Sequence, residues 1–308
     1  MEPTPRTPAR LGGAAAALLL TAAAFSTGAA HPATATTVCE PFGEIPMGEY
    51  WLNNNVWGQD AGSGSQCVED LYQDGDTIGW RTEWDWEGDP YQVKSYVSSV
   101  LGWHWGWNSD EDTGLPVRLS SGRALETAWE YDLRTEGTVA VAYDLWLHDI
   151  ADPGWSDDPA DEVMVWLSAR GGAGPLGERI DTVEVGGERW DLYQGAVEDD
   201  DGQLLWDVHS FVHTGGTRSF EGDLTGFTDH LADRGALEPD QYLSSVQAGI
   251  EVFQGTGVLE TTAYRVTRGV TGGRSRHHGV IASARGTGVA SPSVSREAWS
   301  ACTVLERR

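Results

Sequence analysis

The sequence predicts an all-β protein in which two antiparallel sheets pack against each other. From about Gly48 to Arg268, short runs of alternating apolar and polar residues are separated by Gly, Asp and Pro. Almost no segment has the apolar spacing of a helix, and no internal repeat is visible. Short, regularly spaced strands with turn residues between them are typical of a β-sandwich or a β-barrel.

The alternation places a series of candidate strands, enough for two packed sheets. They are residues 48–56, 77–86, 93–100, 139–148, 162–169, 182–185, 188–193, 204–212, 242–253 and 259–267. One helix interrupts the series, because residues 223–234 place Leu224, Phe227 and Leu231 on one face and Gly235 follows as a stop. We expect this helix to pack against the back of the sandwich.

The first 35 residues have the layout of a secretory signal peptide. Arg6 and Arg10 precede an apolar run over residues 14–25, and a small-residue cleavage site follows at residues 33–35. The run is shorter than the roughly 18 residues that cross a bilayer. We therefore expect cleavage after Ala35 and a secreted, extracellular protein with no membrane partner.

The remainder is predicted to form one large β domain, residues 36–268, followed by a flexible basic tail, residues 269–308. Roughly 270 residues are enough for a single all-β domain. The tail contains Gly, Ser, Arg and His without sustained alternation, a composition that does not support a packed core. A linker or anchor role for the tail stays open, although a tail without function is the simpler interpretation.

The strongly acidic composition limits the possible partners. The chain has 20 Lys and Arg against 47 Asp and Glu, a formal net charge of -27. Such a chain repels phosphate backbones, which disfavours nucleic acid and anionic membranes as partners. A neutral polysaccharide is compatible with the charge, although solubility alone would also explain it. We expect a monomer.

The three cysteines suggest one disulfide and no metal site. Cys39 and Cys67 lie near the predicted mature N-terminus and can pair in an oxidising compartment. Cys302 is left over and is either free or paired with another molecule. The cysteines lack the spacing of metal ligands, and His277 and His278 fall in the predicted tail. We therefore expect neither a metal ion nor another cofactor.

Tryptophan is the most unusual feature of the composition, with 15 Trp against 6 Phe. An exposed indole face can stack on a sugar ring, and its N–H can bond to a hydroxyl. About two thirds of these residues should nevertheless belong to the core, because most large aromatic side chains are mainly buried.

One carboxylate lies on the outward face of the strand that begins at Glu162. Side chains alternate across a strand, so Glu162, Met164 and Trp166 share one face and the aliphatic residues between them form the core face. A carboxylate, a thioether and an indole in a row are not typical of a hydrophobic core, but they are typical of a sugar-binding cleft.

The strand over residues 139–148 repeats this pattern. Asp144 and Trp146 lie on its outward face, and Val, Tyr and Leu side chains form the other face. If this strand pairs with the strand at Glu162 as an antiparallel neighbour, Asp144 approaches Glu162 and can hold it through a hydrogen bond.

A third strand, residues 242–253, places Gln247 and Glu251 on its outward face. Retaining glycosidases use two carboxyls roughly 5–5.5 Å apart, one as nucleophile and one as proton donor. Repulsion at that spacing keeps one carboxyl protonated. We expect the proton on Glu251, in the less polar site, and an ionised Glu162. For each carboxylate taken alone, a solvated surface position stays the alternative.

Six stretches occur in the order in which glycoside hydrolase family 12 carries them. They are residues 53–58 (NNNVWG), 93–96 (VKSY), 115–119 (LPVRL), 143–147 (YDLWL), 162–167 (EVMVWL) and 242–251 (YLSSVQAGIE). The chain therefore resembles this family of retaining endo-β-1,4-glucanases and xyloglucanases over most of residues 39–268. The resemblance implies a β-jelly-roll sandwich with a concave substrate cleft, which makes residues 36–268 the catalytic domain.

The resemblance also implies roles for individual residues. Glu162 would be the nucleophile, Glu251 the acid/base and Asp144 the neighbour of the nucleophile. Sugar contacts and a disulfide follow for other positions. They are Asn55, Trp57 and Met164 from the family motifs, Trp166, Trp146 and Gln247 from the outward strand faces, Trp105 from the indole-rich segment 102–107, and the pair Cys39 and Cys67 as the family's N-terminal disulfide. One departure is Val252, where relatives usually carry Pro.

The predicted function is that of a secreted, endo-acting hydrolase of internal β-1,4-glucosidic bonds in cellulose, mixed-linkage β-glucan or xyloglucan, with retention of configuration. One alternative is a non-catalytic, lectin-like sandwich, although paired acids that must be desolvated bring little to a pure binder. Another is a xylanase of the related jelly-roll family 11, which is disfavoured because the chain lacks a Tyr-rich groove and carries the strand at Glu162. The preferred glucan stays open.

Overall fold

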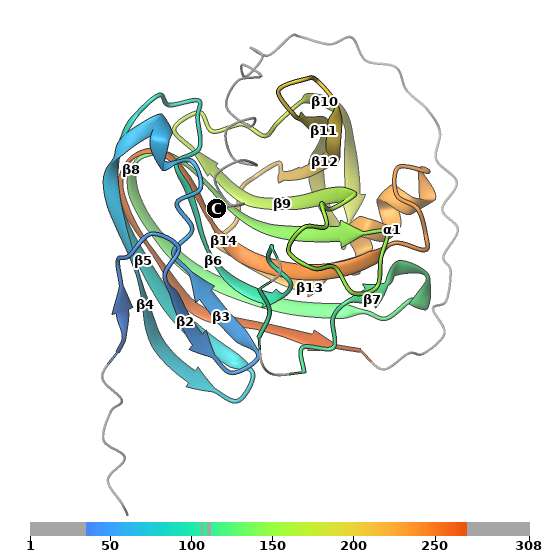
Figure 1. Ribbon diagram of the computed structural model, residues 1–308, viewed down its shortest axis with the longest axis horizontal. Helices are drawn as coiled ribbons and strands as arrows, with labels where there is room; N and C mark the ends of the chain where they lie inside the picture. Colours follow the sequence, from blue (N-terminus) through green and yellow to red (C-terminus); the bar gives the residue numbers. More distant parts are fainter. Residues whose placement is uncertain (1–34, 106, 110–111, 270–308) are drawn as a thin grey trace, which may run out of the picture. The chain divides into compact units, whose positions relative to one another are not determined.

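The computed structural model describes residues 35–105, 107–109 and 112–269, which form two β layers with one short α-helix. Figure 1 shows the strands curving around one another, with β4 and β5 at one side and α1 at the other. The predicted all-β sandwich is confirmed. The predicted signal peptide up to Thr34, the predicted tail from residue 270 and Cys302 lie outside the described residues.

The inner layer is the one that positions the candidate site. Its strands are, in spatial order, β2 (Glu44–Met47), β3 (Tyr50–Asn53), β6 (Ser95–Gly102), the first half of β14 (Tyr242–Arg268), the second half of β8 (Leu125–His148), β9 (Asp161–Arg170), β12 (Leu204–His213), β11 (Glu188–Glu198) and β10 (Glu178–Val185). Neighbours are antiparallel except β9 and β12, which run parallel. This one parallel pair differs from the predicted antiparallel sheets. It forms because the chain after β9 crosses to the sheet edge instead of folding back as a hairpin.

The outer layer continues the same ladder. It contains β1 (Thr37–Val38), β4 (Gly62–Asp74), β5 (Thr77–Gly88), the second half of β14, the first half of β8 and β13 (Ser219–Asp223), and the short β7 (Val117–Arg118) pairs with the start of β14. The predicted disulfide between Cys39 and Cys67 is present and attaches the N-terminal segment to β4. Such a cross-link stabilises a fold mainly by restricting the unfolded chain.

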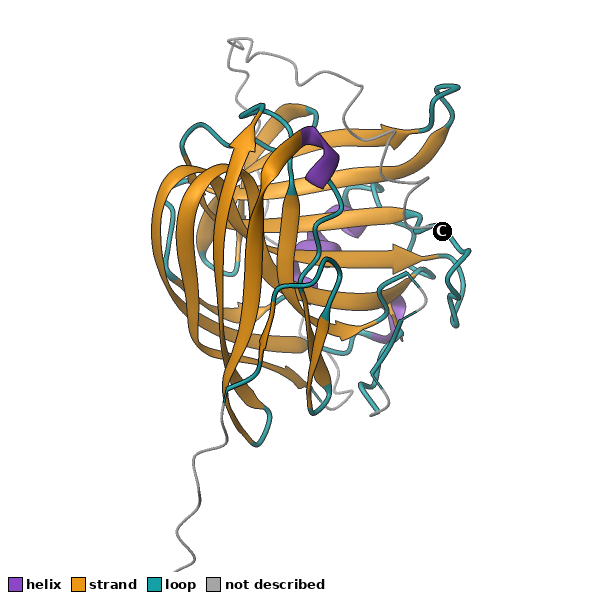
Figure 2. Cartoon of the chain, turned by 60° about the vertical axis from the view of Figure 1, so that its left-hand side comes forward, coloured by secondary structure: helices purple, strands orange, loops and turns teal. Residues whose placement is uncertain are grey.

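The two longest strands connect the layers. β8 and β14 pair from Leu125 opposite Arg268 to His148 opposite Tyr242, and β14 exchanges its neighbour β6 for β5 after Val252. Residues 242–253 and 259–267, predicted as two strands, are therefore one continuous strand. Figure 2 shows that the sheet contains long, strongly curved strands.

Glycines allow the close backbone approach at this turn. Gly137 faces Gly255 in the ladder, and a Cβ atom on Gly137 would lie 2.2 Å from the carbonyl oxygen of Gln254. Gly255 itself has a φ of 95°, which residues with a side chain rarely adopt. Residues without a Cβ are therefore required where β8 and β14 turn from one layer into the other.

The core lies between the two layers. Val163, Val165 and Leu167 are fully buried in it, which confirms the predicted core face of β9. Helix α1 (Thr225–Asp233) covers the same side of the inner layer, since the Phe227 ring lies 5.0 Å from the ring of Phe211 in β12. The helix therefore packs against the back of the sheet, as predicted. None of the described helices is long and apolar enough to cross a membrane.

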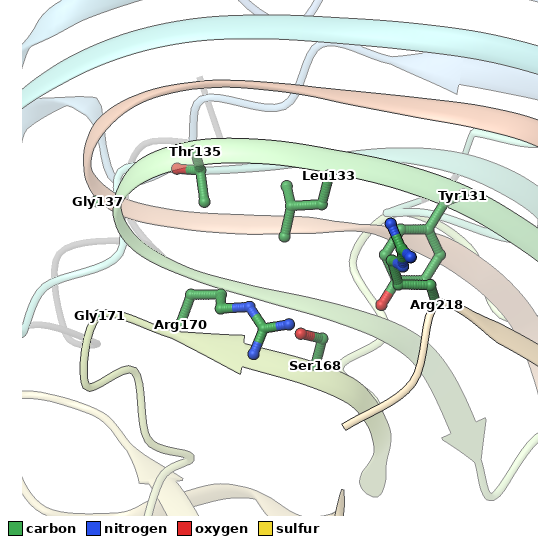
Figure 3. A pocket seen from close by; sticks show the side chains of 8 residues that line it. All are labelled: Tyr131, Leu133, Thr135, Gly137, Ser168, Arg170, Gly171 and Arg218. Carbon is green, nitrogen blue, oxygen red and sulfur yellow. The ribbon is translucent and has the colours of Figure 1, made fainter. Parts of the chain in front are cut away.

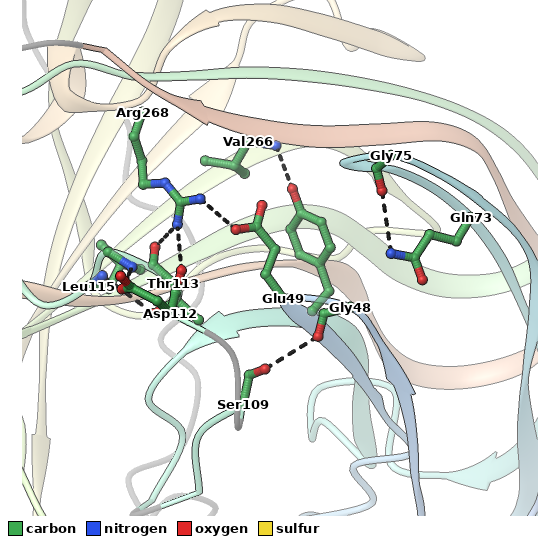
Figure 4. A network of polar contacts seen from close by, with 12 residues as sticks. Gly48, Glu49, Gln73, Gly75, Ser109, Asp112, Thr113, Leu115, Val266 and Arg268 are labelled. Atoms are coloured by element: carbon green, nitrogen blue, oxygen red, sulfur yellow. Dashed lines mark hydrogen bonds and ion pairs between the residues drawn. The ribbon is translucent and has the colours of Figure 1, made fainter.

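The end of β14 is attached to the β2–β3 hairpin and to the loop before β7. The guanidinium of Arg268 lies 2.5 Å from the Glu49 carboxylate and also donates to the Thr113 carbonyl oxygen. The Tyr50 hydroxyl accepts a 2.8 Å hydrogen bond from the Val266 amide (Figure 4). These contacts fix the last described strand against the edge of the inner layer.

Candidate active site

Three neighbouring strands of the inner layer present carboxylates on one face. Asp144 of β8 is in register with Met164 of β9 and with Gln247 of β14. Because alternate residues of a strand share a face, Glu162 lies on the same side as Met164, and Glu251 on the same side as Gln247. We call this side, opposite the core, the cleft face. The structure thus brings the three predicted carboxylates to one surface.

Tyr96 of β6 links the strands that carry these carboxyls. It is in register with Glu251, and its hydroxyl reaches over β14 to donate a 3.0 Å hydrogen bond to the Ala142 carbonyl oxygen of β8. Burial raises the pKa of the phenol well above its usual value, and the carboxyls of Asp144, Glu251 and Glu162 raise it further. The phenol is therefore subject to the electrostatic influence of all three carboxyls.

The Glu162 carboxyl is held by hydrogen bonds. Trp206 of β12 donates its indole N–H to Oε2 of Glu162 at 3.0 Å, and the Asp144 side chain bonds to Glu162 as well. Burial raises the pKa of Glu162 to about 7, and these two hydrogen bonds oppose the rise. They favour the ionised form because a carboxylate is the stronger acceptor.

Asp144 is buried beside Glu162. Burial raises the pKa of Asp144 well above its usual value, and the charges of Glu162 and Glu251 raise it further. A hydrogen bond from Trp146 opposes this rise, whereas the hydrogen bond to Glu162 adds to it. Because the bond between the two carboxyls raises the pKa of Asp144 and lowers that of Glu162, it favours the proton on Asp144.

Glu251 has different surroundings. Its carboxyl makes no hydrogen bond to any residue in the described part of the chain, and 5% of the residue is exposed. Burial raises its pKa to about 8, and the negative charge of Glu162 contributes to the rise. The neutral acid is therefore the stable form of Glu251 near neutral pH, and it can donate a proton.

A pocket opens beside Glu251 and contains several of the predicted sugar contacts. Its lining includes Trp57, Met164 and Trp166 together with Phe253. Asn55 lies next to the pocket, and its side-chain oxygen accepts a 3.0 Å hydrogen bond from the Trp57 amide. Asn55 therefore orients the segment that carries Trp57.

A cluster of four indoles lies near Glu162. It consists of Trp103, Trp105, Trp146 and Trp206, and the ring of Trp105 is 6.1 Å from Trp146 and 6.0 Å from Trp206. Trp105 has a φ of 47°, a strained conformation for a bulky residue and one that is common at functional sites. The predicted Trp105 and Trp146 are thus joined by Trp206 and Trp103, which the sequence interpretation missed. The strand at Trp206 has apolar residues on both faces, so alternation gave no signal there.

Gln247 lies in the floor of the cleft face and is fully buried. Its amide oxygen accepts a 3.0 Å hydrogen bond from Ser98, and its amide nitrogen donates to Nδ1 of His104 at 3.0 Å. Burial lowers the pKa of His104 to about 4, so this imidazole is a neutral acceptor. The network, together with Trp51 against the His104 ring at 5.9 Å, was not predicted. A direct sugar contact of Gln247 stays a prediction.

Val252, the position predicted to depart from the family motif, continues the strand beyond Glu251. It is paired with Ser95 on one side and Val139 on the other, and its side chain is buried in the core. Its carbonyl oxygen also accepts a 2.8 Å hydrogen bond from the Lys94 amide. Regular pairing on both sides therefore fixes the backbone directly after Glu251.

Within the described residues, no group of three or more His, Cys, Asp or Glu side chains could hold a metal ion. The cleft face itself offers one carboxyl whose ionised form is favoured by hydrogen bonds and one whose neutral form is favoured by burial.

Comparison with known proteins decides the family. The sequence profile described as "Glycosyl hydrolase family 12" matches residues 48–267. The chain belongs to this family. The resemblance seen in the sequence motifs is thereby confirmed, and the match contains all three carboxylates of the cleft face.

Family 12 relatives resemble the chain over most of its length. Endoglucanase S of Pectobacterium parmentieri is 38% identical over 219 residues, which cover 71% of this chain and 81% of the relative. Xyloglucan-specific endo-beta-1,4-glucanase A of Aspergillus aculeatus is 36% identical over 229 residues, 73% of this chain and 87% of the relative.

Solved family 12 structures share the fold. The native family 12 xyloglucanase from Bacillus licheniformis superposes with a TM-score of 0.69 at 35% identity, covering 76% of this chain and all of that chain. Endoglucanase 3 of Trichoderma harzianum superposes with a TM-score of 0.66 at 29% identity, over 77% of this chain and 98% of that one. The predicted jelly roll with one short helix is therefore confirmed.

Proposed function

We propose that this family 12 protein is a retaining endo-β-1,4-glucanase in which Glu162 is the nucleophile and Glu251 is the general acid/base. The family and the names of the relatives support hydrolysis of internal β-1,4 bonds in glucans or xyloglucan. The observation that carries the residue roles is the contrast between a hydrogen-bonded Glu162 and a Glu251 without hydrogen bonds, which separates their pKa values in the required direction.

In the first step, the ionised Glu162 attacks the anomeric carbon of the sugar. The bond from this carbon to the leaving oxygen breaks, and Glu251 transfers its proton to that oxygen. The product is a glycosyl ester on Glu162 and a shortened glucan with a free hydroxyl. In the second step, Glu251 takes a proton from water, the water oxygen attacks the anomeric carbon, and the ester bond to Glu162 breaks. Two inversions give net retention.

The change in the role of Glu251 follows from the charge on Glu162. While Glu162 is ionised, its charge raises the pKa of Glu251 and keeps the proton in place. Formation of the ester removes this charge, so the pKa of Glu251 falls and the carboxylate becomes available as a base. Asp144 and Trp206 keep Glu162 ionised before the attack by donating hydrogen bonds to it.

The proposed substrate is a neutral β-1,4-glucan. Aromatic side chains on the cleft face, among them Trp57 and Trp105, can stack on sugar rings, and the net charge of -27 disfavours polyanions. The relatives include both an endoglucanase and xyloglucan-specific enzymes. A reducing-sugar assay on carboxymethylcellulose, barley glucan, xyloglucan and xylan would establish the preference. No release from any of them would support a binding protein.

Secretion and a monomeric state also belong to the proposal. Family 12 enzymes are typically secreted, and the disulfide between Cys39 and Cys67 is compatible with an oxidising compartment. Mass spectrometry of the exported protein should find an N-terminus at residue 36. Size-exclusion chromatography with light scattering should find the mass of one chain.

Azide rescue tests the two roles separately. With an aryl β-cellobioside that has an activated leaving group, Glu162→Ala plus azide should give the α-glycosyl azide, since azide attacks once from the vacated side. Glu251→Ala plus azide should give the β-glycosyl azide, because azide attacks the ester on Glu162. Exchanged anomers would reverse the roles, and wild-type hydrolysis rates in either variant would refute the assignment.

A further inference from the structure

A cavity of about 260 Å³ lies on the core side of the inner layer, away from the carboxylates. Its walls come from the outer half of β8, with Tyr131, Leu133 and Thr135, and from the end of β9, with Ser168 and Arg170 (Figure 3). Ser168 is in register with Val141, which is a core residue. A ligand in this cavity would therefore be separated from the cleft face by the sheet.

Two arginines give the cavity its charge. Arg170 and Arg218 line it, and none of its lining residues is acidic. Burial raises the pKa of the Tyr131 phenol, and the positive charges of both arginines oppose this rise, so both guanidiniums lie near the phenol. In a chain with a net charge of -27, a cavity lined by two cations and no carboxylate is unusual.

The arginines are only partly neutralised by the protein. Arg218 forms a 3.5 Å ion pair with Asp132, but both side chains are largely exposed, and such pairs are weak. No carboxylate of the described residues lies within ion-pair distance of Arg170. In Figure 3, the Arg170 guanidinium extends along the cavity toward Ser168.

A buried hydroxyl adds a polar group to the cavity wall. Ser168 is 3% exposed, and its hydroxyl lies against the Tyr131 phenol. The Tyr131 hydroxyl donates to the Thr217 carbonyl oxygen at 2.6 Å, so its oxygen can only accept from Ser168. The Ser168 hydroxyl can therefore donate either to the Tyr131 oxygen or to an acceptor in the cavity.

We propose that this cavity binds a sugar acid, that is, a single sugar ring with a carboxylate. Planar guanidiniums bind carboxylates through paired hydrogen bonds, and Ser168 would supply a further donor. Leu133 offers apolar surface for a sugar ring, and the nearly buried Tyr131 ring lies behind it. The volume of about 260 Å³ lies just below the range of roughly 300–1,000 Å³ for small-ligand sites, which suits one ring and not a chain. This site is independent of the proposed hydrolytic function.

Isothermal titration of the full chain tests the proposal. Glucuronate should bind with one site per chain, and glucose, which has no carboxylate, should not bind there. Arg170→Gln and Arg218→Gln should each weaken glucuronate binding by about tenfold or more, as expected for loss of a hydrogen bond to a charged group. Ser168→Ala should weaken it less, and the rate of β-glucan hydrolysis should stay unchanged in all three variants.

Arg265→Gln is the matched control, because Arg265 is also a half-exposed arginine but faces Glu221 at 3.9 Å, and it does not line the cavity. It should bind glucuronate as the wild type does. Unaltered glucuronate binding in both cavity arginine variants would place the ligand elsewhere and overturn the proposal. Equal binding of glucuronate and glucose would overturn it too, and phosphate binding as tight as that of glucuronate would refute the sugar-acid assignment.

Discussion

The two glutamates of the cleft face have the same chemistry but different surroundings. Glu162 receives hydrogen bonds from Trp206 and Asp144, and its pKa is about 7. Glu251 receives none from the described residues, and burial together with the charge of Glu162 raises its pKa to about 8. Two identical side chains, on strands separated only by β8, thus differ because one environment stabilises the anion and the other does not.

Hydrogen-bond donors, and not burial, account for the difference between the two proposed roles. Both residues are nearly inaccessible, with exposures of 3% and 5%. Burial raises both pKa values, so by itself it would make both carboxyls acids. Glu251 has no hydrogen-bond donors among the described residues that correspond to the Trp206 indole and the Asp144 carboxyl at Glu162.

The largest expected effect concerns the leaving group. Glu251→Gln should lower turnover of a soluble β-glucan by roughly a thousandfold or more, because it removes the proton donor. On an aryl β-cellobioside whose leaving group needs no proton, formation of the glycosyl ester should be much less affected. Glu162→Gln should be inactive on both substrates. Similar losses for Glu251→Gln on both substrates would contradict the proposed contrast.

The second prediction concerns stability and pH. The pKa of Glu251 is raised in the folded state, so the folded protein binds this proton more strongly than the unfolded chain. The free energy of unfolding should therefore fall as the pH rises from the usual Glu value toward about 8. Glu251→Gln lacks this loss, so it should be more stable relative to wild type at pH 9 than at pH 5, by roughly 2–5 kcal/mol. Urea denaturation at both pH values measures the difference, and equal values would refute the raised pKa.

The third prediction removes one donor on the Glu162 side. Asp144→Ala should lower kcat/KM by about 10- to 100-fold, in line with loss of a hydrogen bond to a charged group. Asp144→Asn keeps a donor of similar shape and should lose much less. If the two variants were equally impaired, a hydrogen bond from residue 144 would not be the feature that matters.

The smallest effect should come from the other donor. The wild-type kcat/KM should decline below about pH 7, as Glu162 takes up a proton, and above about pH 8, as Glu251 loses one. Trp206→Phe removes the indole N–H, so the pKa of Glu162 should rise. The acidic limb of the kcat/KM–pH profile should then move to higher pH by about one unit, the shift expected for the loss of one hydrogen bond.

Trp103→Phe is the control for this shift. Trp103 belongs to the same indole cluster, but its N–H donates to the Gly154 carbonyl oxygen and not to Glu162. Its acidic limb should stay at the wild-type position. An equal shift in both variants would attribute the effect to the cluster as a whole.

The sequence predicted the carboxylate faces well because these faces depend on local alternation. In β9, Glu162 and Met164 alternate with aliphatic residues, so the two-residue alternation of side chains alone distinguishes the cleft face from the core face. The pairing of Asp144 with the β9 strand followed from their proximity in the chain, and the register confirms it. The helix with Phe227 was equally local, since its apolar spacing and Gly235 marked both its face and its end.

Other features depend on contacts between distant segments and could not be predicted. Trp206 approaches Glu162 only because β12 pairs with β9 in parallel, which no local pattern indicates. Gly255 falls between the predicted strands 242–253 and 259–267, although it lies within one strand and allows a close approach to Gly137. The first half of β8 and the largely polar β4 were missed, because their exposed faces are rich in charged residues and Gly.

The turn of β14 between the layers has a consequence for the geometry of catalysis. Glu251 lies four residues before Gly255, so the proposed acid/base directly precedes the point at which the strand passes into the outer layer. After this point the strand pairs with the outer layer, where Trp86 lies opposite Gly255. Substitutions in the outer layer are therefore expected to change the position of Glu251, although these residues do not lie on the cleft face.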